Sequence, residues 1–284
     1  MWTLKKPDIK EAFNDIKAVI AASGGMLVAG DEPRIRRIYQ AYDDNGGTIS
    51  KALNNSMCAK QRKSLQSLYS LTYPKNGRPD KLYFIRKGLF GMVDECPMCG
   101  MHSPQQLDHQ MPKSDYETLA VFRHNLVPVC STCNNKKRKK NASDFVHPYY
   151  AVFPKDVAFL VARVDVDSDN CRVSWEFDIE GEGLKNEKLL EQINNQVTVI
   201  ELFDRLSKAS NNYLSEILYR QFFYNDEQLK YFLRWEYDKN LDLYKLNHWR
   251  TALISALLQK ESFNYQVANH FVKNIRPVNN GYGA

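Results

Sequence analysis

Cys96-Pro-Met-Cys99 is followed, after 30 residues, by Cys130-Ser-Thr-Cys133, and these two Cys-x-x-Cys pairs decide the fold of the segment between them. Each pair can present two sulfurs toward one point, so four thiolates can surround Zn²⁺ tetrahedrally. A single pair also fits a redox dithiol, but two pairs in one short region favour zinc. The sequence therefore predicts a structural zinc site at Cys96, Cys99, Cys130 and Cys133.

Polar residues suited to hydrolysis lie in and just after this segment. Asp108 and His109 are adjacent, Asn125 precedes the second cysteine pair, and Asn134 follows it. Phosphodiester hydrolysis needs an activated water and a cation beside the phosphate. A histidine can take a proton from water near neutral pH, and carboxylate and amide oxygens suit Mg²⁺. An isolated Asp-His pair is usually an ordinary surface pair, so this interpretation depends on the surrounding framework.

Three strings resemble the HNH (ββα-metal) nucleases, in the subtype with four zinc-binding cysteines: Leu107-Asp-His-Gln-Met-Pro-Lys-Ser114, Asn125-Leu-Val-Pro-Val-Cys130 and Cys133-Asn-Asn-Lys-Lys137. The resemblance covers about 45 residues and implies a strand, a turn, a second strand and a helix. It implies that His109 is the catalytic base, oriented by Asn125, and that Asp108 and Asn134 bind a catalytic Mg²⁺ or Mn²⁺. Asn134 replaces a histidine ligand of many members, and its amide oxygen disfavours softer metals.

A run of cations begins two residues after Asn134 and consists of Lys136, Lys137, Arg138, Lys139 and Lys140. Such a run is usually just solvated, but on a helix facing the scissile phosphate it would bind the nucleic-acid backbone without reading its sequence. Residues 1–150 contain 23 Lys and Arg against 14 Asp and Glu, net +9, and residues 151–284 contain 16 against 19, net −3. We therefore expect the first half to bind nucleic acid. The resemblance to HNH nucleases implies that double-stranded DNA is the partner.

Hydrophobic periodicity organises the rest of the 284 residues into an α+β protein, in which the ββα-metal motif lies between helical flanks. We expect a mainly helical region at 1–90, the HNH domain at 91–150, and a β-hairpin plus helices at 151–284. The hairpin is predicted from alternation in 157–166 and 172–179. Helices are expected at 8–20, 31–42 and 60–69, along one stripe from 190 to 203, and at 209–223, 226–237, 242–259 and 262–273. The aromatic residues of the C-terminal part are interpreted as core or partner packing rather than base stacking.

The resulting hypothesis is a metal-dependent HNH endonuclease that cleaves DNA, or RNA. The alternative is a zinc-stabilised nucleic-acid-binding or docking subunit without cleavage activity, and a small-molecule hydrolase has no pocket motif in its favour. HNH proteins with large helical flanks resemble effectors of bacterial antiphage and restriction systems. The chain has no Gly-x-x-x-x-Gly-Lys-[Ser/Thr] loop, so an ATPase would be a separate partner. A homodimer could place two sites on opposite strands.

The N-terminal residues, Met1-Trp-Thr-Leu-Lys-Lys-Pro7, lack the apolar run of a signal peptide, and no uncharged stretch is long enough to span a membrane. We therefore expect a cytoplasmic protein with reduced cysteines. Cys58 and Cys171 are isolated in the sequence and are expected to be small buried apolar residues.

Overall fold

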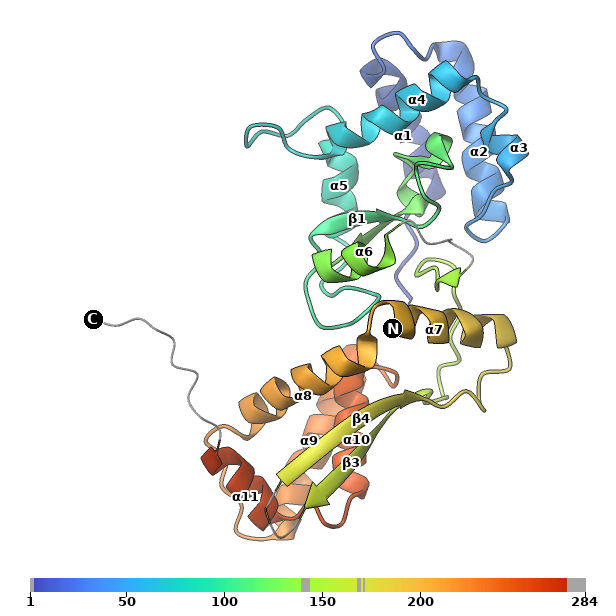
Figure 1. The fold of residues 1–284 in the computed structure, drawn as a ribbon. Coiled ribbons are helices and arrows are strands. Elements are labelled where there is room, and N and C mark those ends of the chain that lie inside the picture. The colour runs from blue at the N-terminus through green and yellow to red at the C-terminus, as the bar shows by residue number, and fades with distance from the viewer. Residues whose placement is uncertain (1–2, 139–143, 168–169, 171, 275–284) are drawn as a thin grey trace. The chain divides into compact units, whose positions relative to one another are not determined.

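A computed structural model describes residues 3–138, 144–167, 170 and 172–274. The chain forms two compact units, one of Met1–Phe153 with Asn186–Ile200 and one of Pro154–Lys185 with Glu201–Ala284. Helices and two-stranded antiparallel sheets make up both units (Figure 1), which confirms the predicted α+β class. None of the helices in the described part is long and apolar enough to cross a membrane.

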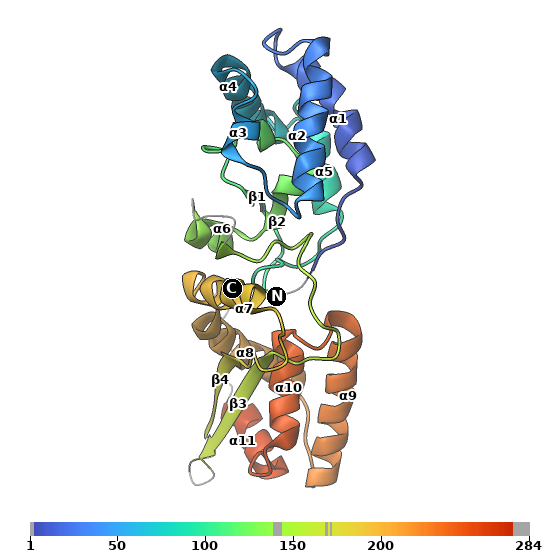
Figure 2. The same ribbon diagram turned by 90° about the vertical axis from the view of Figure 1, so that its right-hand side faces the viewer.

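Helices form the N-terminal part of the first unit (Figure 2). The first begins after Asp8, whose carboxylate accepts a hydrogen bond from the Lys10 backbone N–H. The second carries Pro33 in its first turn and ends before Gly46 and Gly47, which both have positive φ. The elements are α1 (Ile9–Ala22), η1 (Ala29–Asp31), α2 (Glu32–Asp44), α3 (Lys51–Asn54), α4 (Ala59–Leu68), η2 (Tyr69–Thr72) and α5 (Tyr83–Phe90). The short α3 and α5 have no counterpart among the predicted helices.

The ββα motif of the first unit has the order that the resemblance implies. β1 (Gln106–His109) pairs antiparallel with β2 (Leu126–Val129), and Asp108 lies opposite Val127. The loop between them contains η3 (Glu117–Leu119) and η4 (Arg123–Asn125), and α6 (Ser131–Lys137) follows β2. Helix α7 (Glu187–Val199) also belongs to this unit.

One apolar core serves both the N-terminal helices and the ββα motif. Phe122, in the loop before β2, stacks on Tyr39 of α2 at 4.0 Å between ring centroids and meets Tyr42 edge-on at 5.3 Å. All three side chains are buried, and Leu107 and Leu126 of the two strands join the same cluster. The helical region and the motif therefore fold together, and the predicted boundary at residue 90 falls inside the first unit.

The isolated cysteines differ from the sequence expectation where they can be described. Cys58 is exposed and not buried, because it directly precedes α4 at the surface. Cys171 lies outside the described residues.

A buried ion pair joins α1 to the loop before β2. Arg123 donates through Nε to Asp15 Oδ2 at 2.5 Å and through Nη2 to Asp15 Oδ1 at 3.2 Å. Burial raises the pKa of Asp15, and the Arg123 guanidinium opposes that shift. Glu11 adds an exposed carboxylate 3.4 Å from Arg123 Nη1. The pair fixes α1 against the segment that carries Asn125.

We expect Asp15→Ala to lower the free energy of unfolding by about 3–5 kcal/mol, because it leaves the Arg123 charge buried without its bidentate partner. Urea denaturation measures the loss. Glu32→Ala is the control, since it breaks a surface pair with Arg36 (3.0 Å) and should cost less than about 1 kcal/mol. Equal small losses in both variants would contradict the assignment.

The second unit combines a hairpin with helices. β3 (Leu160–Asp167) pairs with β4 (Arg172–Ile179), as alternation predicted, and α10 (Trp249–Gln259) packs against both β3 and α9 (Asp226–Tyr244). Helices α8 (Leu202–Leu218) and α11 (Tyr265–Asn274) complete the described part of the unit. The predicted stripe from 190 to 203 is not one helix, because α7 ends at Val199 and Glu201 adopts a φ of 49°. Helix α9 runs further than expected and ends before Lys245, whose φ is 72°.

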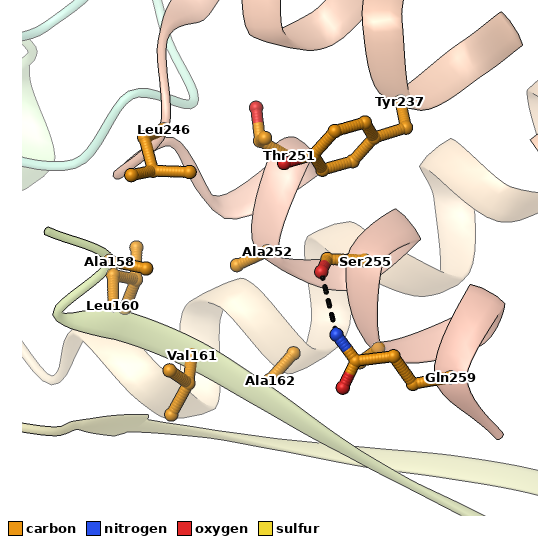
Figure 3. A pocket seen from close by; sticks show the side chains of 11 residues that line it. Ala158, Leu160, Val161, Ala162, Tyr237, Leu246, Thr251, Ala252, Ser255 and Gln259 are labelled. Atoms are coloured by element: carbon orange, nitrogen blue, oxygen red, sulfur yellow. Dashed lines mark hydrogen bonds between the residues drawn. The ribbon is translucent and has the colours of Figure 1, made fainter. Parts of the chain in front are cut away.

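A small cavity of about 100 Å³ lies between β3 and helices α9 and α10 (Figure 3). At its edge Gln259 Nε2 donates to Ser255 Oγ at 3.3 Å. The described residues that line it include no carboxylate, histidine or cation. They are Ala158, Leu160, Val161, Ala162, Tyr237, Leu246, Thr251, Ala252, Ser255, Ala256 and Gln259.

Candidate functional site

Four buried cysteines meet in the first unit. Cys96 and Cys99 lie in the loop before β1, Cys130 precedes α6, and Cys133 lies in its first turn. Their sulfur atoms all lie within 4.8 Å of one another, and Cys99 Sγ is 3.8 Å from Cys130 Sγ. Tetrahedral Zn–S bonds of about 2.3 Å place neighbouring sulfurs about 3.8 Å apart. The cluster therefore fits a structural zinc ion, in agreement with the prediction from spacing.

A cleft of about 460 Å³ lies beside β1 and α6. Residues predicted for catalysis, a cation of the basic run and side chains of the helical region all line it. The lining includes Asp108, His109, Asn134 and Arg138, and the helical region contributes Gln66, Tyr69 and Tyr73. Asn125 does not line this cleft. Three of the four residues predicted for catalysis, Asp108, His109 and Asn134, therefore line the same open cleft.

His109 is held as a single tautomer. Its Nε2 lies 2.9 Å from the backbone oxygen of Ala120. A carbonyl oxygen can only accept, so Nε2 carries the proton and the Nδ1 lone pair is left as the base. Among the described residues, none forms a hydrogen bond with Nδ1. Burial lowers the pKa of His109 to about 3, so the imidazole is neutral at pH 7.

Asp108 forms an ion pair with Lys137, which changes the interpretation of the basic run. Lys137 is only 1% exposed, and its Nζ donates to Asp108 Oδ2. Burial raises the pKa of Asp108, and the Lys137 ammonium opposes that shift. Lys137 lies three residues after Asn134, on the same helix face toward β1. It therefore points into the protein, whereas the sequence grouped it with cations available to nucleic acid.

The other cations of the run differ in position. Arg138 is exposed and lines the cleft, and Lys136 is half-buried on α6. Lys139 and Lys140 lie outside the described residues.

Asn134 presents its amide oxygen rather than its amide nitrogen as the open group. Its Nδ2 donates to Gln106 Oε1 of β1. This leaves Oδ1 without a hydrogen-bond donor among the residues that the structure describes. A carboxylate and an amide oxygen on one cleft match the hard oxygen ligands of Mg²⁺ and Mn²⁺.

Comparison with known proteins agrees with this geometry. Residues 96–140 match the family model described as HNH endonuclease. This segment is an HNH endonuclease domain. Over 100 residues the chain is 32% identical to Protein ea31 of Escherichia phage lambda, and the match spans 34% of this chain and 33% of the phage protein. No solved structure matches the chain.

Asn125 of the HNH domain has a different environment from the one expected of a residue that orients His109. It is fully buried, and its side chain forms no hydrogen bond with His109 in the described structure. Its Nδ2 donates to the carbonyls of Met111 and Leu119 at 3.0 and 3.2 Å. The direct hydrogen bond to His109 comes from the Ala120 carbonyl instead, so Asn125 is linked to His109 only through the loop.

Outside the HNH domain, Tyr69 contacts His109 directly. Its ring meets the His109 imidazole at 4.4 Å between centroids in a T-shaped arrangement. Its hydroxyl donates to the Leu107 carbonyl at 2.7 Å, and Lys113 Nζ lies 4.0 Å from the centre of its ring. Sequence periodicity assigned Tyr69 only to a helix face. No local signal could reveal its role, because the contact depends on how the helical region packs on β1.

We expect the loss of one zinc ligand, in Cys133→Ser, to lower both the zinc content and the thermal unfolding midpoint, because the cluster fixes the loop before β1 to α6. Native mass spectrometry and a thermal scan measure these effects. Cys58→Ser is the matched control, since Cys58 is exposed and lies outside the cluster. Equal zinc content in wild type and Cys133→Ser would refute the assignment.

The neutral state of His109 predicts a pH-dependent stability. The unfolded chain binds a proton at this residue below about pH 6.5, whereas the folded state stays neutral down to a pKa of about 3. The contribution of His109 is fully present above about pH 6.5 and is lost as the pH falls toward 3. Relative to His109→Ala, wild type should therefore lose up to about 2 kcal/mol of unfolding free energy between pH 7 and pH 5. Urea denaturation of both proteins measures this, and a constant difference would rule it out.

Proposed function

We propose that this protein is a metal-dependent endonuclease that hydrolyses phosphodiester bonds, with double-stranded DNA as its substrate. The observation that carries the proposal is the cleft on which Asp108, His109 and Asn134 meet beside Arg138. The HNH domain supports a nucleic-acid substrate.

His109 acts as the general base. Its Nδ1 takes the proton of the attacking water while Nε2–H remains bound to the Ala120 carbonyl. The low pKa of the ring keeps Nδ1 unprotonated at neutral pH, although it also makes the imidazole a weaker base. Fixing the ring in one tautomer means that no rotation is needed before the proton transfer.

Asp108 and Asn134 would hold the catalytic Mg²⁺ or Mn²⁺. When bound, such an ion would supply Lewis-acid stabilisation of the charge that develops on the leaving oxygen. Lys137 binds one carboxylate oxygen of Asp108, which favours the ionised carboxylate that a metal ligand requires. The Gln106 side chain holds the Asn134 amide so that its oxygen is the group left for a cation.

Cations on the cleft bind the substrate backbone. Arg138 and Lys113 both line it, and Lys136 extends the positive surface along α6. Lys139 and Lys140 continue the run in the sequence. Contacts of this kind hold phosphates and make binding salt-dependent without reading bases.

The alternative is a zinc-stabilised binding or docking module that does not cleave. Such a module has no chemical need for a histidine held as one tautomer with an open Nδ1. The arrangement of His109 therefore favours the nuclease.

The wider setting of the proposal is bacterial antiphage defence or restriction, with the chain acting as an effector beside an ATPase partner. Exposed aromatic side chains in the second unit support a docking role: Tyr224, Tyr231 and Trp235 are 74%, 78% and 54% exposed. A symmetric dimer would allow both strands to be cut. Gentle co-purification that recovers neither a partner nor a dimer would count against this setting.

We expect wild-type protein to nick or linearise plasmid DNA with Mg²⁺ or Mn²⁺ and to lose this activity in EDTA. His109→Ala should cut at least about 100-fold more slowly, because it removes the base. His102→Ala is the matched control, since His102 is an exposed histidine of the same domain. A parallel RNA substrate tests the preference for DNA.

Equal cleavage by wild type and His109→Ala would reject the assigned base. Binding by both without cleavage by either would select the non-cleaving module.

A further inference from the structure

The side chain of Asn125 uses every hydrogen-bonding position it has, although it is completely buried. Both protons of Nδ2 are donated to the carbonyls of Met111 and Leu119. Its Oδ1 accepts from the Met111 backbone N–H at 2.7 Å and from the Tyr42 hydroxyl at 3.1 Å. A side-chain amide has two donor protons and two acceptor lone pairs, so no capacity remains.

This saturation fixes the direction of the hydrogen bonds beyond Asn125. Because Oδ1 can only accept, the Tyr42 hydroxyl must donate to it. The Tyr42 oxygen lies 2.9 Å from His147 Nε2, which must then be the donor to that oxygen. His147 Nδ1 in turn accepts from the Tyr149 backbone N–H at 3.3 Å. In the hydrogen-bond chain that runs from Tyr149 through His147 and Tyr42 to Asn125, each group is therefore assigned as either donor or acceptor without conflict.

This hydrogen-bond chain is linked to His109, the proposed base, through the loop between β1 and β2. Asn125 binds the Leu119 carbonyl, and the next residue, Ala120, supplies the carbonyl that holds His109 Nε2. The buried side-chain amide of Asn125 therefore holds this loop at two positions, Met111 and Leu119. A shift of Asn125 would move the acceptor that selects the tautomer of His109.

We propose that Tyr42 and His147 are positioning residues for the catalytic base, and that the helical region thereby completes the HNH site. Both lie outside the matched segment 96–140, Tyr42 on α2 and His147 in the chain after α6. The proposal rests on the proposed nuclease function. Neither residue lines the cleft, so they act through Asn125 and the loop.

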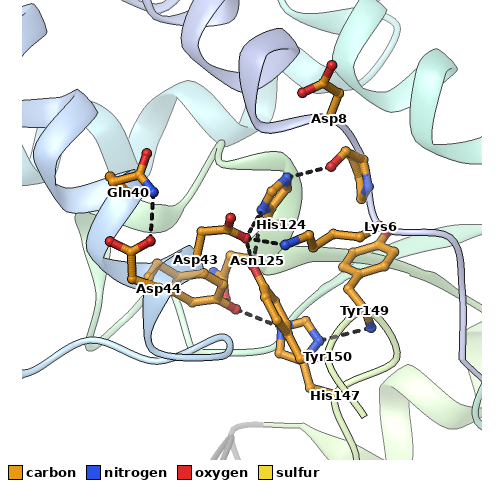
Figure 4. A network of polar contacts seen from close by, with 12 residues as sticks. Lys6, Asp8, Gln40, Asp43, Asp44, His124, Asn125, His147, Tyr149 and Tyr150 are labelled. Atoms are coloured by element: carbon orange, nitrogen blue, oxygen red, sulfur yellow. Dashed lines mark hydrogen bonds and ion pairs between the residues drawn. The ribbon is translucent and has the colours of Figure 1, made fainter. Parts of the chain in front are cut away.

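Burial and surroundings support this role. Tyr42 is 0% exposed, and burial raises its pKa well above the ordinary value, so its hydroxyl keeps the proton that it donates. Figure 4 shows Asn125 and His147 within one polar network in the first unit. The Tyr42 ring also meets Phe122 edge-on, which limits the positions that its hydroxyl can take.

The test compares Tyr42→Phe with Tyr149→Phe. Both changes remove one buried hydroxyl. Tyr149 contributes only its backbone N–H to the hydrogen-bond chain, and the substitution keeps that group; its hydroxyl donates to the Leu126 carbonyl at 3.0 Å and not to Asn125. Plasmid cleavage gives kcat and KM for each variant. The ¹⁵N spectrum of the histidine rings, with the His109 signals assigned by their loss in His109→Ala, reports the tautomer of His109. Zinc content and unfolding midpoint are measured alongside.

We expect Tyr42→Phe to lower kcat by about 10-fold or more with KM changed less than about 2-fold, and to convert His109 from pure Nε2–H into a tautomer mixture. Tyr149→Phe should keep the wild-type kcat and tautomer. If Tyr42→Phe matches Tyr149→Phe in both readouts, the proposal is wrong.

A second pair of variants applies if Tyr42→Phe does not fold. His147→Gln keeps an N–H that can donate to Tyr42, whereas His147→Leu removes it, so kcat should follow the order wild type, Gln, Leu. Equal rates in the two variants would overturn the proposal. If wild type itself cuts neither DNA nor RNA, the nuclease function fails, and the ring ¹⁵N spectra of the same variants still decide whether the chain positions His109.

Discussion

The buried amide of Asn125 is the constraint on which the loop beside the proposed catalytic centre depends. An amide removed from water costs free energy unless its donors and acceptors are satisfied, about 1–3 kcal/mol for each unsatisfied group. Asn125 meets this requirement with Met111, Leu119 and Tyr42. These partners belong to the loop between the strands and to α2. The fold can therefore bury this side chain only when the loop and the helical region are both in place.

The same dependence appears in the apolar core. Phe122 lies between Tyr39 and Tyr42 of α2, and the strand residues Leu107 and Leu126 join the same cluster. Close-packed interiors transmit small displacements, so the helices influence the loop that leads to Asn125. The four clustered cysteines lie at the other end of the motif, where a bound zinc ion would fix the loop before β1 to the start of α6.

Two neighbouring cations of the basic run, Lys137 and Arg138, have opposite orientations. Lys137 is buried against the Asp108 carboxylate, whereas its neighbour Arg138 is exposed and lines the cleft. A buried carboxylate without such a partner would favour its protonated form, in which it is a poor metal ligand. One cation of the run is thus paired with the carboxylate proposed as a metal ligand, and the next lines the cleft proposed to bind substrate.

The sequence by itself determined the features that depend on local spacing. Two Cys-x-x-Cys pairs predicted the four-cysteine cluster, and the resemblance of the strings around Asp108, His109 and Asn134 to the HNH nucleases implied the strands and helix that the structure contains. Only the tertiary structure decided the hydrogen bonds of Asn125, the inward direction of Lys137, the contact of Tyr42 with Asn125 and that of Tyr69 with His109. Hydrophobic periodicity reports which face of an element is buried, but not which distant segment it meets. Those partners are far apart along the chain, and they come together only when the helices and the HNH domain pack around one core.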